Sequence, residues 1–313
     1  LNTTQTRQNQ RRAHTPPAHS QMANHPAMNT QPALRNQAAP AKLNLFLHIL
    51  GQRSDGYHLL QSVFMLIDWQ DSLDFTRTTN GHISRSDESR TPLPANDLCT
   101  RAASLLQQHS GCHYGAHIHL RKSIPTQAGM GGGSSNAATT LIALNRLWQL
   151  NYTPQQLATI GLQLGADVPF FLAGHNAWVE GIGEQIQAIQ LPSARWLIVK
   201  PETGVSTPAI FSAPDLFRAT PAATMHDFVT ANDPFSFGHN DLQPIATRLC
   251  PPIAQALEWL AQHGLQGRMT GSGSAVFAKL PPESQIDVKK LQQSAKKNWI
   301  IRVCNNLSPQ PVI

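Results

Sequence analysis

The 313-residue sequence has only four cysteines, and they form no recognisable motif. Cys99, Cys112, Cys250 and Cys304 are widely separated, and no two of them make a Cys-x-x-Cys pair. This pattern argues against a disulfide framework and favours free thiols in a reducing compartment, so we expect a cytoplasmic protein. The sequence also lacks a run of about eighteen apolar residues, which a membrane-spanning helix would need. We therefore expect no membrane partner.

Metal-binding patterns are missing as well. No His-Glu-x-x-His segment occurs, and the pair His117 and His119 is better explained as two solvated residues on one face of a strand than as a metal site.

Charge is scarce and unevenly distributed, with 13% charged residues and a formal net charge of +6. The first 40 residues contain four arginines, no acidic residue and no aromatic residue. The rest of the chain therefore carries 20 basic groups (24 less 4) against 18 acidic ones. The chain after residue 40 is therefore nearly neutral, and the basic tail has no aromatic side chains that could stack on bases. Both observations argue against a nucleic acid partner.

Composition also suggests how the chain is divided. Residues 1–38 are rich in Gln, Asn, Pro and Ala without hydrophobic periodicity, so we expect a disordered tail. Two explanations compete for this segment. One is a transit peptide, although the segment is poor in serine and lacks an amphipathic face; the other, which we favour, is a dispensable tail or a start site placed too far upstream. The remaining length suits two modest domains, which we place at 39–192 and 193–313, on either side of the break at Pro192.

A glycine-rich loop that leads into a helix is the most informative feature that is present. It runs from Pro125 to Ala138, and the following residues 141–148 have the apolar spacing of a helix. Glycines let several backbone N–H groups converge on one point, and the helix adds its positive end there, so the loop suits a polyphosphate. It has no Gly-Lys-Ser/Thr ending, and Ser134 breaks the dinucleotide pattern, so neither a Walker A loop nor a GxGxxG loop is present. A linker or tight packing turn is the alternative.

Other elements are expected from local patterns. Residues 42–49 alternate as a strand that places Lys42 opposite its aliphatic side chains, and a second strand covers about 59–66. Helices are expected at 96–108, at 253–263 and from the capping box at Thr153 to Gly165. Strands are expected at 117–120, 196–199 and 275–280.

Two further segments could contribute to a site. Asp167 lies between a glycine and a proline-containing apolar run; it is either the N-cap of a short helix or a general base for a hydroxyl. The small-residue turn Thr270–Ala275 precedes a strand and could close over a ligand from the second domain.

These segments together resemble the GHMP kinases, the family of galactokinase, homoserine kinase, mevalonate kinase and phosphomevalonate kinase. The family's Pro-x-x-x-Gly-x-x-Gly-Gly-Ser-Ser loop is found at 125–135. The segments 39–45, 51–58, 165–169 and 270–273 are similar to the branch that acts on a methylerythritol linked to cytidine diphosphate, and they fit in order along nearly everything after residue 38.

The resemblance implies an α+β fold of two domains. The first would be like ribosomal protein S5 domain 2, the second a ferredoxin-like α/β sandwich, and the active site would lie in the cleft between them. It implies ATP and Mg²⁺ as cofactors, a small-molecule acceptor as partner, and a monomer or weak homodimer.

It also implies roles for individual residues. Asp167 would take the proton of the acceptor's hydroxyl, while Lys42 would keep Asp167 ionised and stabilise the developing charge. The residues implied to bind the nucleotide are Lys122, Pro125, Thr126, Gln127, Ala128, Gly129, Met130, Gly131, Gly132, Gly133, Ser134 and Ser135. The residues implied to bind the acceptor are Asn44, Tyr57, His58, Thr207 and Phe211.

Three alternatives remain at this stage. The acceptor could be another small alcohol, such as homoserine or mevalonate, although the segment 56–58 favours the cytidylated one. The chain could be a nucleotide-binding module without activity, but the presence of both Lys42 and Asp167 argues against this. The basic tail could bind RNA, which predicts affinity that falls with salt.

Overall fold

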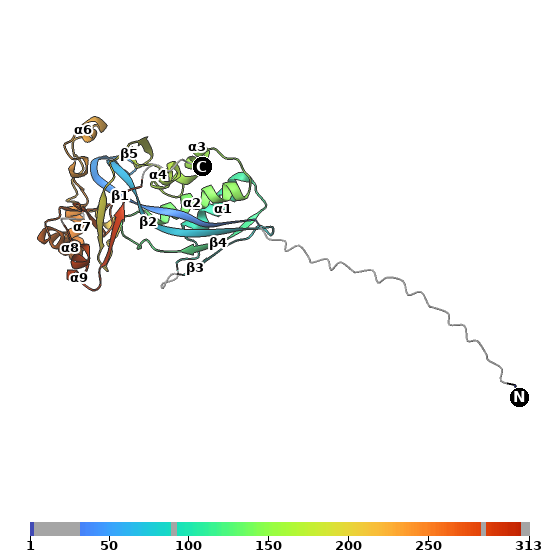
Figure 1. Cartoon of the computed structure of the whole chain (residues 1–313). Helices are drawn as coiled ribbons and strands as arrows, with labels where there is room; N and C mark the ends of the chain where they lie inside the picture. The colour runs from blue at the N-terminus through green and yellow to red at the C-terminus, as the bar shows by residue number, and fades with distance from the viewer. Residues whose placement is uncertain (3–31, 89–92, 283–285, 308–313) are drawn as a thin grey trace. The chain divides into compact units, whose positions relative to one another are not determined.

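A long antiparallel pair of strands runs through the centre of the first sheet and organises the fold. The computed structural model describes residues 1–2, 32–88, 93–282 and 286–307. Strand β1 (Ala33–Gln52) pairs with β2 (His58–Thr78) along nearly their whole length, with irregularities in register that bend the pair (Figure 1). The turn that joins them, at residues 53–57, places Tyr57 directly before β2.

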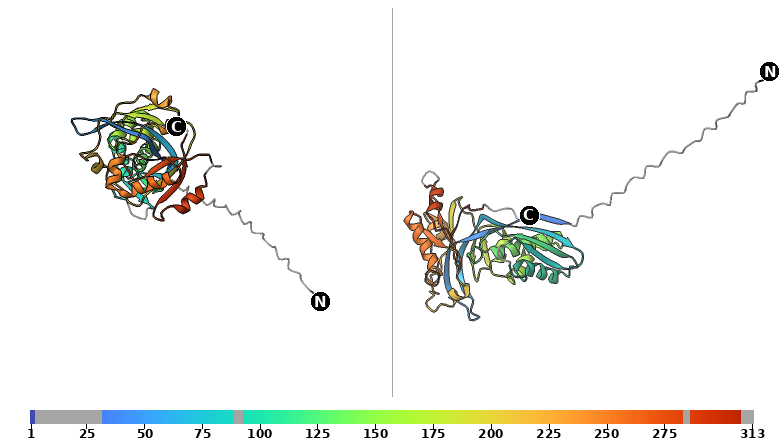
Figure 2. Two further views of the ribbon diagram at one scale, coloured as in Figure 1. Left: turned by 90° about the vertical axis from the view of Figure 1, so that its left-hand side faces the viewer. Right: turned by 90° about the horizontal axis from the view of Figure 1, so that it is seen from below.

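The first sheet is built on β2 and has helices packed against it. Its order is β3-β4-β2-β5-β6 with β1 also paired to β2, and its other strands are β3 (Ile83–Asp87), β4 (Gly115–Arg121), β5 (Ala177–Glu180) and β6 (Gln185–Ala188). The associated helices are α1 (Leu98–Ser110), α2 (Gly132–Leu147), α3 (Pro154–Leu162) and α4 (Val168–Ala173). Their apolar faces meet the sheet in a single buried cluster, which includes α2 from Ala137 onward (Figures 1 and 2).

A second, smaller sheet forms from the last third of the chain. Its order is β10-β7-β9-β8, comprising β7 (Arg195–Lys200), β8 (Gly267–Met269), β9 (Val276–Lys279) and β10 (Ile300–Asn305). Its core includes residues of α7 (Gln243–Leu249), α8 (Pro251–Gln262) and α9 (Val288–Ser294). Short elements lie between β7 and α7, namely α5 (Thr207–Phe211), α6 (Met225–Val229) and the 3₁₀ turn Pro234–Ser236.

The two sheets are joined by a shared apolar cluster, and the described residues between 32 and 307 belong to one compact unit. In this cluster Leu43 and Met65 of the first sheet are buried with Trp196 and Phe277 of the second. Farther along β1, Leu47 belongs to the core of the second sheet. A cut at residue 192 therefore separates the sheets along the chain but not in their packing, because β1 contributes to both.

The α+β fold expected from the sequence is confirmed, and most expected elements are present with shifted ends. The capping box at Thr153 forms as expected. The first helix begins at Leu98 rather than residue 96, because the Asp97 side chain caps it by accepting the N–H of Thr100 at 3.0 Å.

One expectation about the tail is wrong at its end. Strand β1 begins at Ala33, so the last residues of the segment 1–38 lie in the sheet. Ala33 pairs with Thr76, and the N–H of Asn36 donates to Asp74 Oδ1 at 2.7 Å. Pairing with β2 thus supplies the order that local composition did not indicate. Residues 3–31 of the tail lie outside the described part of the chain.

Candidate active site

The glycine-rich loop is shaped by three residues with positive φ. Gln127, Gly129 and Gly131 have φ values of 54°, 73° and 69°. Gly131 is the N-cap of α2, and no side chain caps this helix end. The first N–H groups of a 16-residue helix are therefore available to an anion at the point where its dipole is positive.

A cavity of about 560 Å³ lies against this loop. Its lining includes residues 125–134 of the loop, together with Lys122, Leu98 and Cys99. Ser135 does not line it: its hydroxyl is buried and has no hydrogen-bond partner within the described residues. The loop residues expected to bind the nucleotide thus surround one cavity, with Ser135 placed behind its wall.

Asp71, which the sequence analysis did not single out, holds the entrance to the loop. This aspartate is fully buried on β2, and its Oδ1 accepts the N–H groups of Ser123 at 2.7 Å and Ile124 at 2.8 Å. Its Oδ2 accepts a hydrogen bond from Lys122 Nζ. Asp71 therefore fixes both the path of the chain into the loop and the direction of the Lys122 ammonium. No local motif marks it, because these partners lie about fifty residues away.

The second glycine motif packs against the backbone of the glycine-rich loop. A Cβ atom placed on Gly273 would lie 1.8 Å from Gly129 N, and one on Gly129 would lie 2.1 Å from Thr270 O. The N–H of Ala275 also donates to Ala128 O at 3.2 Å. The turn 270–273 does not line this cavity, so its expected closure over a ligand stays a prediction.

Thr207 lies beside the glycine-rich loop. It lines the loop cavity, and its hydroxyl is 2.6 Å from that of Ser272. The sequence analysis placed it with the acceptor.

Lys42 and Asp167 come together beside the loop. Lys42 Nζ lies 3.5 Å from Asp167 Oδ2, and the Lys42 N–H donates to Met130 O at 3.0 Å. Asp167 is the N-cap residue of α4, yet its side chain makes no capping hydrogen bond. Asp167 thus occupies the cap position while its carboxylate faces the lysine, and its role as a general base stays a prediction.

The surroundings of Lys42 are apolar. Its side chain is 5% exposed and its ammonium lies 4.5 Å from the centre of the Phe64 ring. Burial lowers the pKa of Lys42 from its ordinary value, and the charge of Asp167 partly opposes this effect. The charge of Asp167 therefore favours the charged form of the lysine.

Asn44 connects this pair to the second sheet. Its Oδ1 accepts a hydrogen bond from Lys42 Nζ, and its N–H donates to Thr270 Oγ1 at 2.9 Å. Asn240 holds the same turn, donating from Nδ2 to Met269 O at 2.8 Å and to Gly271 O at 2.9 Å. Asn240 follows no motif that the sequence could have revealed. Asn44, expected to contact the acceptor, lies next to Lys42.

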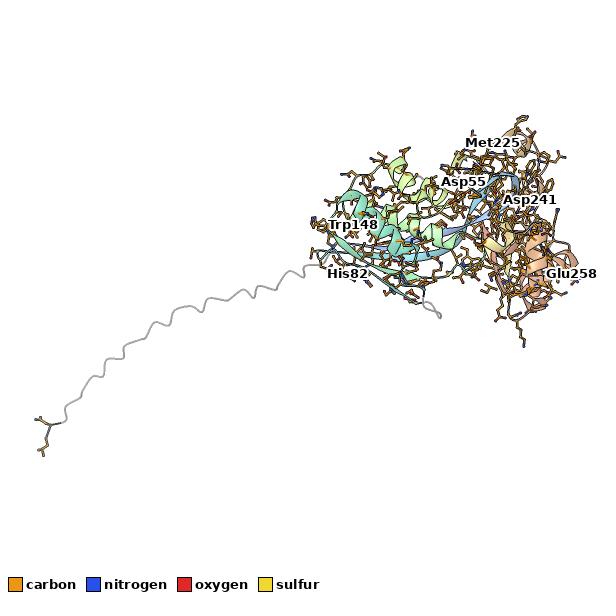
Figure 3. The ribbon with its side chains drawn as sticks, turned by 180° about the vertical axis from the view of Figure 1, so that it is seen from behind. Asp55, His82, Trp148, Met225, Asp241 and Glu258 are labelled. Atoms are coloured by element: carbon orange, nitrogen blue, oxygen red, sulfur yellow. The ribbon has the colours of Figure 1, made fainter. Side chains whose placement is uncertain are left out.

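A third group of side chains gathers where β2 begins. The rings of His58 and Phe211 have centroids 4.9 Å apart, and Arg218 Nε donates to His58 Nε2 at 3.0 Å. Tyr57 is 59% exposed, next to the turn that contains Asp55, which Figure 3 labels. Two of the residues expected at the acceptor, His58 and Phe211, are thus in contact, whereas Arg218 was not expected.

The remaining expectations concern metals and membranes. His117 contacts Ser84 at 2.9 Å and His119 contacts Glu88 at 2.9 Å, on the strand face expected for them. No group of three or more His, Cys, Asp or Glu side chains suited to a metal occurs within the described residues. No helix in that part of the chain is long and apolar enough to cross a bilayer.

Comparison with known proteins agrees with this geometry. The family model described as GHMP kinases N terminal domain matches residues 97–175, and the model described as GHMP kinases C terminal matches residues 216–300. A curated protein of Polaromonas naphthalenivorans named 4-diphosphocytidyl-2-C-methyl-D-erythritol kinase is 57% identical over 92% of this chain and 98% of its own. A protein of Delftia acidovorans with the same name is 57% identical over 90% of this chain and 96% of its own.

Solved structures show the same fold. A crystal structure of 4-(cytidine 5'-diphospho)-2C-methyl-D-erythritol kinase matches with a TM-score of 0.70 and 29% identity, covering 87% of this chain and 99% of that one. Homoserine kinase from Cytophaga hutchinsonii matches with a TM-score of 0.65 at 15% identity, covering 91% of this chain and 97% of that one, which shows a shared fold alone. Because the two family models together match more than half of the chain and a curated relative is 57% identical over 92% of it, this chain belongs to the GHMP kinase family.

Proposed function

We propose that the protein transfers the γ-phosphoryl group of ATP to the 2-hydroxyl of 4-diphosphocytidyl-2-C-methyl-D-erythritol, giving the 2-phosphate and ADP. The reaction would belong to the non-mevalonate route to isopentenyl diphosphate. The observation that carries the proposal is the 3.5 Å approach of Lys42 Nζ to Asp167 Oδ2, directly beside a loop that can hold phosphates. A loop alone would bind a nucleotide, whereas this pair adds a base and a cation.

The chain's own groups can supply the chemistry. Phosphoryl transfer through a loose transition state depends mainly on positioning and on charge stabilisation. Asp167, 32% exposed, can accept the proton of an approaching hydroxyl. Lys42 can stabilise negative charge as the phosphoryl group moves, and the N–H groups at the start of α2 can hold the phosphates in line.

Family membership supports ATP as the phosphoryl donor, and the loop offers oxygen groups that suit Mg²⁺. Ser134 lines the cavity, and its Oγ would lie 4.0 Å from a Cβ placed on Gly165, on the side of the Asp167 turn. Mg²⁺ is commonly held by few protein oxygens together with nucleotide phosphates, so the lack of a dedicated cluster among the described residues fits this ion. We propose Ser134 as its protein contact. When bound, Mg²⁺ would neutralise phosphate charge.

The acceptor's cytidine end fits the group at the start of β2. Phe211 and Tyr57 offer aromatic faces for a pyrimidine ring, and His58 offers a hydrogen-bonding edge beside Phe211. The proposal includes a cytoplasmic enzyme that works as a monomer or weak homodimer. The four free cysteines agree with a reducing compartment.

A turnover panel tests the proposal. Purified protein with ATP and Mg²⁺ should phosphorylate the cytidylated alcohol and leave homoserine and mevalonate unchanged. Turnover of either other alcohol with none of the cytidylated one would refute the acceptor assignment.

Asp167→Asn tests the role of the base. We expect this variant to bind ATP normally and to lose turnover by about 10²–10⁴-fold, the usual contribution of general base catalysis. Asp287→Asn is the matched control, because Asp287 caps α9 by accepting the N–H of Lys290 at 3.1 Å and asparagine caps equally well. Normal turnover in Asp167→Asn would remove Asp167 from the mechanism.

A further inference from the structure

Arg218 occupies a position that no expectation assigned to it, between the start of β2 and the segment that carries Phe211. Besides its bond to His58, its guanidinium donates to three backbone carbonyls: Leu216 O, Phe211 O and Ala213 O, each at 2.9 Å. A planar guanidinium that makes four bonds of this kind has a fixed orientation. Arg218 therefore ties the chain at Phe211 to the ring of His58.

The bond between Arg218 and His58 determines the protonation of the histidine. Arginine stays protonated in proteins, so Nε of Arg218 is the donor and Nε2 of His58 must offer a lone pair. A protonated imidazole would instead turn an N–H toward the guanidinium. His58 is therefore neutral, and its hydrogen is on Nδ1.

We propose that Arg218 is a positioning residue for the acceptor site: it fixes His58 as the neutral Nδ1–H tautomer, held against Phe211, so that the histidine presents one hydrogen-bond donor to a pyrimidine base. Nδ1 of His58 has no hydrogen-bond partner within the described residues. A pyrimidine offers acceptor atoms on its edge and a face for Phe211, so one donor next to one aromatic ring matches both. This inference rests on the proposed function, since it concerns the cytidylated acceptor.

The surroundings of His58 determine in which direction acceptor binding should change with pH. Burial lowers the pKa of His58 from its ordinary value of 6.5, and the positive charge of Arg218 lowers it further. The nearby acids have partners of their own, Asp55 with Arg53 at 2.7 Å and Asp215 with Arg248 at 2.8 Å. Below its pKa the ring is protonated and loses its bond to Arg218. The kcat/KM for the acceptor should therefore fall as the pH drops through that pKa.

Kinetics of Arg218→Gln test the inference, with Arg248→Gln as control. Within the described residues, the Arg248 side chain pairs with the exposed Asp215 and not with His58. Arg218→Gln should raise KM for the cytidylated acceptor at least tenfold and leave KM for ATP within twofold. The acid limb of kcat/KM for the acceptor should move to higher pH, because the charge that lowers the pKa of His58 is gone. A purely structural role would not move this limb. An unchanged limb and acceptor KM, as expected for Arg248→Gln, would overturn the inference.

The tautomer can also be measured without any substrate. Nitrogen-15 spectra of the imidazole rings of the free wild-type protein, assigned with His58→Gln, should show His58 at pH 7.5 as a neutral ring with hydrogen on Nδ1. Hydrogen on Nε2, or a charged ring, would overturn the inference even if Arg218→Gln failed to fold. If the spectra show the expected tautomer but the wild-type protein does not phosphorylate the cytidylated acceptor, the proposed function is refuted. The inference that Arg218 serves the acceptor site is then refuted as well, whereas the assignment of the His58 tautomer is not.

Discussion

Two backbone turns of the site approach each other so closely that adding a single methyl group at Gly273 should disturb them. Gly273 of the second glycine motif lies against the phosphate loop, and a Cβ atom there would be 1.8 Å from Gly129 N and 2.1 Å from Ala128 C. Both atoms are backbone, so no side chain can rotate away. Ordinary van der Waals contact begins near 3.4 Å, so Gly273→Ala must separate the two turns by about 1.6 Å, the difference between those two distances.

Such a separation should affect catalysis more than folding. Overpacking of this kind costs about 1–3 kcal/mol, which a chain of this size can tolerate. A shift of about 1 Å in a positioning loop can cost about 10²-fold in rate. We therefore expect Gly273→Ala to remain folded and to lose at least 10²-fold in kcat, with weaker ATP binding. Steady-state kinetics, titration with a fluorescent ATP analogue and thermal unfolding measure the three quantities.

Gly51→Ala provides the matched control, because a Cβ there meets nothing within 4 Å. It should retain its kcat and its melting temperature within error. If Gly273→Ala kept the wild-type kcat while remaining folded, the two turns could not be in contact during turnover. The role of the second glycine motif as a support for the loop would then be refuted.

Two further predictions follow from buried polar groups. On the alkaline side, the rate should decline at a pH below 10.5, because burial lowers the pKa of Lys42 and the charged lysine is the active form. In Asp167→Asn, assayed with excess enzyme, this decline should move to lower pH, because the variant lacks the negative charge that opposes the effect of burial on Lys42. Asn240→Asp should reduce kcat and lower stability by about 1–3 kcal/mol, since a carboxylate would face two carbonyls. Asn306→Asp, which alters a partly exposed amide remote from the loops, should not reduce kcat in the same assay.

Local sequence patterns correctly predicted features that depend on only a few neighbouring residues. The alternation around Lys42, the glycines of the loop and the capping box at Thr153 each act over a few residues, and each has its expected local form. The segment 33–38 was misjudged for the same reason. Its order comes from pairing with residues of β2 some forty positions away, which composition cannot reveal.

The supporting residues were missed because their partners are distant in sequence. Asp71 meets Lys122 across fifty-one positions, Asn240 meets Met269 across twenty-nine, and Arg218 meets His58 across one hundred and sixty. An isolated Asp, Asn or Arg carries no mark of such a contact. The turn 270–273 was recognised as part of the site, but the sequence could not show how closely it packs against the loop. Only the packing of two backbones reveals this contact.

The burial of Lys42 and Asp167 adds a second direction of support to the one that the family resemblance implied. Resemblance to the family implied that Lys42 keeps Asp167 ionised. Yet Lys42 is the buried partner, 5% exposed, while Asp167 is 32% exposed and retains contact with water. A buried ammonium loses hydration and needs a nearby anion, whereas a hydrated carboxylate needs its partner less. Asp167 is therefore expected to serve twice, as the base for the hydroxyl and as the charge that keeps Lys42 protonated, so replacing it should weaken both functions together.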